Sequence, residues 1–216
     1  MSRLPGVQLT SELEDYIESL LPDRDPLMLR MEEEIATSNI PGIGPAVGQL
    51  LALLLRIAGT RDVIELGTAI GYSAIWLARG CSGKVVTLEL DRSRADRAGR
   101  YLAKAGLAER VQVLREDGVA YLEREERLVD CVFNDLLNSM RDEATVERCF
   151  ELSLRRLRPG GLLLADNALR RGEVTAPRSQ GARNVVRYNQ LVAREPRLES
   201  VIVPLRDGVS IARLAY

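Results

Sequence analysis

Acidic and amide side chains follow two apolar segments that have the composition of short buried strands. Asp135 follows residues 129–133, and Asp166 and Asn167 follow residues 161–165. The carboxyl ends of neighbouring parallel strands lie about 4.8 Å apart at one sheet edge, so these side chains can share a ligand. Two carboxylates and an amide oxygen suit Mg²⁺, Mn²⁺ or Ca²⁺ better than zinc. An ordinary polar turn at residues 166–167 also explains the pattern, and both interpretations stay open.

A glycine-containing turn follows another apolar segment, residues 63–66. Gly67 would permit a tight turn and close approach of a ligand, and Gly71 would permit close contact between helix and strand. Ser73 falls in the first turn of the next predicted helix, where free N–H groups and a hydroxyl can hold an anion. A turn that merely connects two elements would look similar, so this motif needs support from a second element.

Glu89 provides that support, because it ends the next apolar segment, residues 85–90, 22 residues after Gly67. An acid at this strand end is placed to accept hydrogen bonds from two ribose hydroxyls, although a helix cap or surface acid is the alternative. The turn lacks the G-x-G-x-x-G spacing of dinucleotide sites, and no second mononucleotide-binding half follows. S-adenosylmethionine is therefore favoured over a dinucleotide.

Composition narrows the chemistry further. The chain has 216 residues, a net charge of −1 and no histidine, which excludes Ser–His–Asp triads, Cys–His pairs and His-ligated zinc. No global basic field exists to hold nucleic acid or an anionic membrane. Cys81, Cys131 and Cys149 stand at wide spacings, which predicts reduced core thiols rather than disulfides. With no apolar leader and no membrane-length apolar run, we expect a soluble, cytoplasmic protein.

The elements that must position these residues alternate between strands and helices after residue 60, which predicts an α/β fold with a parallel sheet covered on both faces. Predicted strands lie at residues 63–66, 85–90, 111–114, 129–133 and 161–165, and predicted helices at 72–79, 92–105, 118–123, 141–158 and 182–195. Residues 170–183 are predicted to form a loop. Strands at 198–204 and 209–214, joined through an Asp-Gly turn, predict an antiparallel hairpin and about seven strands in total.

Residues 1–60 are predicted to be helical, with helices near 10–20, 26–36 and 46–58. We interpret the chain as a single domain, residues 1–216, in which residues 1–60 form a helical part and residues 61–216 form the cofactor-binding α/β core.

Six segments resemble one family in the same order along nearly the whole chain. They are V-I-E-L-G-T-A-I-G-Y-S (63–73), V-V-T-L-E-L-D (85–91), A-G-L-A-E-R-V-Q-V (105–113), D-C-V-F-N-D (130–135), L-R-P-G-G-L-L-L-A-D-N (157–167) and V-P-L-R-D-G-V-S-I-A (203–212). The chain is similar to class I S-adenosylmethionine-dependent methyltransferases, and more narrowly to the metal-dependent O-methyltransferases related to catechol and caffeoyl-CoA O-methyltransferase, including their small bacterial members.

This resemblance implies a Rossmann-like methyltransferase fold, a seven-stranded mostly parallel sheet with extra N-terminal helices, and a homodimer. It implies methyl transfer to a hydroxyl of a small catechol-like or vicinal-hydroxy acceptor, with S-adenosylmethionine and a divalent metal. The metal is assigned to Asp135, Asp166 and Asn167, and the catalytic positions are Asp135 and Asn138. The implied cofactor contacts are Ile43, Glu65, Gly67, Thr68, Gly71, Tyr72, Ser73, Glu89, Leu90, Asp117, Gly118, Val119 and Asp135.

One departure concerns the family's D-x-x-K motif, in which the lysine is the general base. Asn138 stands at that position, and Asn134 replaces a normally apolar residue. Activity then requires an acceptor acidic enough for metal activation alone or another base. A non-catalytic protein that binds S-adenosylmethionine or S-adenosylhomocysteine is the main alternative, and a tRNA-modifying methyltransferase is a third.

Two further features have alternative explanations. Trp76 is predicted to be a core residue rather than an adenine contact, because of its helical spacing with Tyr72 and Leu77. An arginine-rich segment forms either a solvated face or a site for an anionic substrate such as a CoA-type or tRNA phosphate; it comprises Arg170, Arg171, Arg178, Arg183 and Arg187. The scarcity of aromatic residues weakens the nucleic-acid interpretation.

Overall fold

The computed structural model describes residues 9–38 and 40–215, and it confirms the predicted α/β fold. One seven-stranded sheet has the strand order β3-β2-β1-β4-β5-β7-β6. The strands are β1 (Val63–Leu66), β2 (Val85–Leu88), β3 (Val111–Leu114), β4 (Val129–Asn134), β5 (Leu157–Ala165), β6 (Leu198–Val203) and β7 (Val209–Leu214). β1 to β5 pair in parallel, whereas β7 runs antiparallel to both β5 and β6, so the predicted C-terminal hairpin is confirmed.

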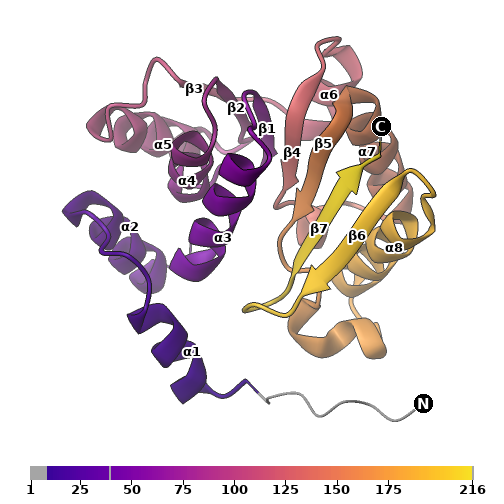
Figure 1. Cartoon of the computed structure of the whole chain (residues 1–216), viewed down its shortest axis with the longest axis horizontal. Coiled ribbons are helices and arrows are strands. Elements are labelled where there is room, and N and C mark those ends of the chain that lie inside the picture. Colours follow the sequence, from indigo (N-terminus) through magenta and orange to yellow (C-terminus); the bar gives the residue numbers. More distant parts are fainter. Residues whose placement is uncertain (1–8, 39, 216) are drawn as a thin grey trace.

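Helices cover both faces of this sheet (Figure 1). They are α1 (Ser11–Ser19), α2 (Pro26–Thr37), α3 (Gly44–Ile57), α4 (Tyr72–Gly80), α5 (Arg92–Lys104), α6 (Gly118–Arg124), α7 (Glu143–Arg156) and α8 (Gln180–Arg194), with short 3₁₀ helices η1 (Leu137–Ser139) and η2 (Arg170–Thr175). Buried side chains of α2 to α5 form one core layer. Those of α6 to α8 form the second layer on the opposite face.

Several predicted boundaries are wrong by a few residues. α7 ends at Arg156 and β5 begins at Leu157, although the sequence predicted a helix to residue 158 and a strand from 161. The extra strand residues pair with β4 across an irregular register at Val129, which local sequence does not reveal. The segment predicted as a loop, residues 170–183, contains η2 and the first turns of α8, which begins where Ser179 caps it.

Polar contacts of α2 add to the apolar packing that holds the N-terminal helices against α4 and α5. The Tyr72 hydroxyl donates to the Glu32 carboxylate at 2.7 Å, and Glu34 accepts from Tyr101 and pairs with Arg97. These contacts join α2 to α4 and α5. They hold the segment after α2, which includes Ile40 to Gly42, near the carboxyl ends of the strands.

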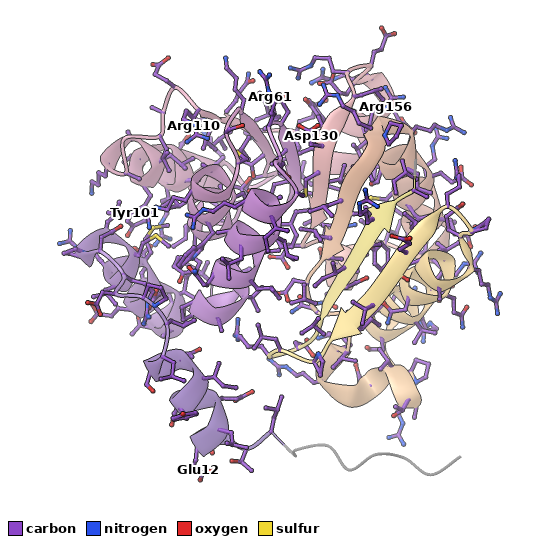
Figure 2. All side chains as sticks on the ribbon, viewed as in Figure 1. Glu12, Arg61, Tyr101, Arg110, Asp130 and Arg156 are labelled. Atoms are coloured by element: carbon purple, nitrogen blue, oxygen red, sulfur yellow. The ribbon has the colours of Figure 1, made fainter. Side chains whose placement is uncertain are left out.

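The opposite, amino-terminal edge of the sheet is held by Asp130 at the start of β4. Its carboxylate accepts from the backbone N–H groups of Arg61 at 2.9 Å and Asp62 at 2.8 Å, and it pairs with Arg158 at 2.8 Å. Figure 2 shows Asp130 beside Arg61 at this edge. These bonds fix β1, β4 and β5 together, so their carboxyl ends keep a constant relative position.

The core predictions for the cysteines and for Trp76 are confirmed. Cys81, Cys131 and Cys149 are free thiols in the interior, and burial raises the pKa of each. Trp76 is 7% exposed and packs so closely on Gly48 of α3 that a Cβ there would lie 2.4 Å from the indole. Across residues 9–38 and 40–215, no helix is long and apolar enough to cross a membrane. Part of the segment expected to lack a leader, residues 1–8, lies outside the described residues.

Candidate active site

The glycine turn after β1 is shaped by residues with positive φ. Gly67 has φ +98°, a conformation that favours glycine, and a Cβ there would also lie 3.0 Å from the Leu136 side chain. Ala69 also has positive φ, at +46°, and its N–H donates to the Glu89 carboxylate at 2.9 Å. Glu89 therefore links the end of β2 to the turn after β1.

A cavity of about 390 Å³ opens beside this turn, and we call it the glycine-turn cavity. Six of the predicted cofactor residues line it: Gly67, Glu89, Leu90, Asp117, Gly118 and Asp135. Val119 lines an adjoining cavity of about 620 Å³, to which Leu90 and Asp117 also contribute. The predicted cofactor residues after β1, β2, β3 and β4 thus meet in one region, as the strand-end argument requires.

The other predicted cofactor residues lie in the interior and line neither cavity: Ile43, Glu65, Thr68, Gly71, Tyr72 and Ser73. The Thr68 hydroxyl shares a hydrogen bond with that of Thr87, and the Tyr72 hydroxyl is bonded to Glu32. Gly71 has φ +92° and approaches Ala98 of α5. The expectation that Gly71 serves a helix–strand contact is therefore wrong, because the close neighbour is another helix.

Glu65 is a completely buried acid at the end of β1. Burial raises its pKa to about 7, the hydroxyls of Ser73 and Thr87 oppose that rise, and the charge of Glu89 adds to it. Glu65 also raises the pKa of Asp135. Glu65 therefore lies beneath the site without lining either cavity, and its raised pKa favours the protonated carboxyl up to about neutral pH.

A second cavity, of about 440 Å³, contains the predicted metal residues, and we call it the carboxylate cavity. Its lining consists of Ile35, Ile40, Pro41, Gly42, Asp135, Asn138, Asp166, Asn167, Arg170, Arg171, Arg206 and Asp207. Pro41, Asp135, Asn138 and Asn167 line both this cavity and the glycine-turn cavity. The two cavities therefore adjoin at these shared residues, with Asp135 and Asn138 among them.

The two carboxylates of this cavity are buried. Burial, followed by the charges of Asp166 and Glu65, raises the pKa of Asp135 well above its usual range, and Arg206 opposes this. Burial likewise raises the pKa of Asp166 to about 6, opposed by the Asn167 backbone N–H and by Arg206. One oxygen of Asp166 is buried without a hydrogen-bond partner among the described residues. A cation would offset the repulsion and satisfy that oxygen.

Asn138 and Asn167 form a short chain of side-chain hydrogen bonds that ends at Asp166. The Asn138 amide N–H donates to the Asn167 Oδ1 at 2.7 Å, and the Asn167 amide N–H donates to Asp166 at 3.2 Å. Asn167 has φ +60°, which Asn tolerates better than most residues. Within the described part of the chain, no cluster of three or more His, Cys, Asp and Glu residues is placed to hold a metal. A metal here would have Asp135 and Asp166 as its only charged ligands, with amide oxygens beside them.

Asn134 has a structural role at the end of β4. Its side-chain oxygen accepts from the Leu136 N–H at 2.9 Å, and its amide contacts the Cys149 sulfur at 3.6 Å. The side chain is only 2% exposed. It thereby fixes the turn that presents Asp135 and Leu136, which explains a polar residue where an apolar one was expected.

Sequence reasoning missed the walls of both cavities. Ile35, Ile40 and Pro41 come from the N-terminal part, Arg206 and Asp207 from the hairpin turn, and Leu136 and Ser139 from the region of η1. Of the arginine-rich segment, only Arg170 and Arg171 line the carboxylate cavity. Arg183 and Arg187 instead pair with Glu143 and Glu147 of α7 at 3.3 and 2.7 Å. The solvated-face interpretation thus holds for part of that segment.

A parallel sheet with ligand-binding residues at its carboxyl ends, closed by an antiparallel hairpin, defines a Rossmann-like methyltransferase. The family model of O-methyltransferases matches residues 24–215. The chain therefore belongs to the O-methyltransferase family, as the resemblance of its motifs implied, and it is an S-adenosylmethionine-dependent enzyme of that family.

Individual relatives agree with this assignment. A catechol O-methyltransferase of Niastella koreensis is 31% identical over 95% of this chain and 97% of its own. A caffeoyl-CoA O-methyltransferase of Pinus taeda is 29% identical over 78% of this chain and 70% of its own. The crystal structure of an O-methyltransferase from Bacillus cereus in complex with S-adenosylhomocysteine is 32% identical, with a TM-score of 0.81 over 94% of this chain and 97% of that one.

Proposed function

We propose that this enzyme methylates one hydroxyl of a small catechol-like or vicinal-hydroxy acceptor, with a divalent cation at Asp135 and Asp166. The observation that supports this proposal is the meeting of the two cavities at Asp135 and Asn138. The glycine-turn cavity would hold the methyl donor, and the carboxylate cavity would hold the acceptor. A methyl group at the junction then lies between its donor sulfur and the acceptor oxygen, as in-line displacement requires.

The donor would be held by strand-end residues of the glycine-turn cavity. Glu89 has both carboxylate oxygens fixed by backbone N–H groups, those of Ala69 and Asp91, each at 2.9 Å. Its remaining lone pairs are available to the two ribose hydroxyls. Gly118 and Leu136 provide a narrow apolar wall beside Gly67, suited to a flat adenine ring.

The cation proposal depends on the chemistry of the donor set. Asp135 and Asp166 are two buried carboxylates with raised pKa values, and one Asp166 oxygen has no partner in the described residues. Such a set fits a hard divalent cation, preferably Mg²⁺, with Mn²⁺ or Ca²⁺ as alternatives. When bound, the cation would stabilise an ionised acceptor hydroxyl and lower its pKa. Asn167 would join the ligands only if its oxygen left the Asn138 amide.

Asn138 does not act as a general base, because an amide nitrogen accepts no proton at useful pH. Its amide instead holds Asn167, and its own side-chain oxygen is buried without a partner in the described region. That oxygen could accept a hydrogen bond from an acceptor hydroxyl and orient it. Proton loss then depends on the acidity of the acceptor in the site.

A methyl-transfer assay with a panel of catechols of increasing acidity tests the proposal. We expect turnover that depends on added Mg²⁺, is lost on chelation and is lost in Asp166→Ala. Calorimetry on the same preparations should show that Asp166→Ala still binds S-adenosylhomocysteine. Cofactor binding without turnover on any catechol would favour the non-catalytic alternative, and turnover on tRNA alone would favour the RNA-modifying one.

The homodimer also remains a prediction. Exposed apolar side chains on α3 and on edge strand β6 are available to such an interface: Leu53, Ile57, Val201 and Ile202. Light scattering of the purified protein would measure its mass in solution, and a monomer across micromolar concentrations would contradict the expected dimer.

A further inference from the structure

Three arginines form one wall of the carboxylate cavity. Arg170 and Arg171 come from η2, and Arg206 comes from the turn between β6 and β7. Among the ion pairs of the described residues, none involves these three side chains, whereas Arg183 and Arg187 nearby are both paired. The Nε of Arg170 is buried and has no hydrogen-bond partner in the described region. Unpaired guanidinium groups in a ligand cavity are suited to an anion.

The backbone segment that carries Arg170 and Arg171 is held against the hairpin turn. Arg170, Arg171 and Gly172 have successive positive φ values of +46°, +51° and +82°, a conformation that costs energy for the two arginines. The loop is fixed to the hairpin turn, because the N–H groups of Ala168 and Leu169 donate to the Gly208 and Asp207 carbonyls at 2.8 Å. These bonds fix the backbone of the loop beside the hairpin turn, at the cavity that Arg170 and Arg171 line.

The Asp207 carboxylate also lines the cavity; it accepts the backbone N–H of Arg171, and among the described residues it forms no ion pair with a guanidinium. Arg206 is fixed from the other side by its hydrogen bond to the Gly42 carbonyl at 3.1 Å. That bond leaves most guanidinium N–H groups of Arg206 free for a ligand. The arginines at this cavity thus keep guanidinium N–H groups that a ligand can use.

We propose that the acceptor carries a carboxylate, and that Arg170, Arg171 and Arg206 bind it. This inference rests on the proposed function, because it identifies the substrate class of the same site. A ring with its hydroxyls toward Asp135 and Asp166 would contact Ile35, Ile40 and Pro41, and an acid group across the ring would face the arginines. The matching chemistry is a catechol carboxylic acid, in which the carboxylate is attached to the ring or to a short chain.

A CoA thioester matches this arrangement less well. Its phosphates are many bonds from the acceptor ring, whereas the three arginines line the same 440 Å³ cavity as Asp135 and Asp166. The planar guanidinium fork binds carboxylate and phosphate alike with two parallel hydrogen bonds, so the position of the arginines in the acceptor cavity carries the distinction. Tighter binding of a CoA thioester than of the free acid would therefore contradict the inference.

Calorimetry on the full chain, loaded with S-adenosylhomocysteine and Mg²⁺, tests this inference without turnover. We expect 3,4-dihydroxybenzoate to bind at least tenfold more tightly than its uncharged methyl ester, since charge-assisted hydrogen bonds are stronger than neutral ones. The preference should shrink in high salt, because part of the wall is exposed. Arg171→Gln and Arg206→Gln should each reduce the preference severalfold. Arg178→Gln is the matched control, because Arg178 lies on the same segment but lines no described cavity.

Methyl-transfer rates on the same ligands separate this inference from the proposed function. Equal binding of acid and ester, together with turnover of the ester, would overturn the carboxylate inference and leave the catechol function intact. A caffeoyl-CoA-type thioester that outcompetes the free acid would likewise overturn it. Failure of both dihydroxybenzoates to bind, with S-adenosylhomocysteine still bound, would overturn the inference and the catechol function together. A preference that persists in Arg171→Gln and Arg206→Gln would show that other residues recognise the acid.

Discussion

Replacing Glu65 with glutamine should stabilise the protein at neutral and alkaline pH. The side chain is completely buried, and burial raises its pKa from 4.5 to about 7. A carboxyl whose pKa is raised by folding keeps its proton in the folded state while the unfolded state loses it. The free energy of unfolding of the wild type therefore falls as the pH rises from about 4.5 to about 7. The gap between these pKa values corresponds to about 3 kcal/mol, lost in full above pH 7.

Urea unfolding of wild type and Glu65→Gln between pH 5 and pH 8 measures this effect. The difference in unfolding free energy should grow by about 2.5 kcal/mol in favour of the variant across that range, because only the wild type has the titrating group and part of the effect is already present at pH 5. Glu126→Gln is the control, since Glu126 is exposed and its substitution should leave the difference flat. A constant difference for Glu65→Gln would refute the argument, because it would mean that Glu65 titrates alike in both states.

Three other substitutions test the site. Glu89→Ala should weaken S-adenosylhomocysteine binding in calorimetry by about 1–3 kcal/mol, through loss of charge-assisted hydrogen bonds, and unchanged affinity would remove Glu89 from the cofactor site. Asp166→Asn should raise the metal-free melting temperature by a few degrees, because it removes one of two buried carboxylates with raised pKa values. The same variant should lose further stabilisation by Mg²⁺. A retained Mg²⁺ response would place the ion elsewhere. Asn138→Lys should increase methyl transfer to weakly acidic catechols by roughly 10²-fold or more, and no gain would show that proton removal does not limit the rate.

The strand-end logic recovered much of the site from sequence. Glu89, Asp135 and Asp166 were each predicted from an apolar segment followed by an acid, Asp117 was implied by the family resemblance, and all four line the cavities at the carboxyl edge. The prediction succeeds because the carboxyl ends of neighbouring parallel strands lie side by side at one edge of the sheet. The start of β5 was missed because Pro159 and Gly160 resemble a turn, although these residues belong to the strand.

The walls of the site were not predictable in the same way. The hydrogen bond between Arg206 and Gly42 joins residues 164 positions apart, and neither residue stands out in a local window. Ile35 and Pro41 reach the cavity through the position of α2, which is held by the polar contacts of Glu32 and Glu34 and by the buried Met28 and Met31. Such contacts arise from tertiary packing, so no period or motif in the sequence encodes them.

The neighbours of Asn138 indicate which acceptors the site can serve without a lysine at this position. Gly181 at the start of α8 leaves space for two groups at once, since a Cβ there would lie 2.9 Å from the Asn138 carbonyl oxygen and 3.2 Å from the Arg170 Nε. A positive charge therefore still lies close to residue 138, but on a guanidinium, which does not release its proton in proteins. Arg170 can stabilise an anionic acceptor and cannot deprotonate a neutral one. This arrangement is best suited to an acceptor that already carries a negative charge and whose hydroxyl ionises readily at a bound cation.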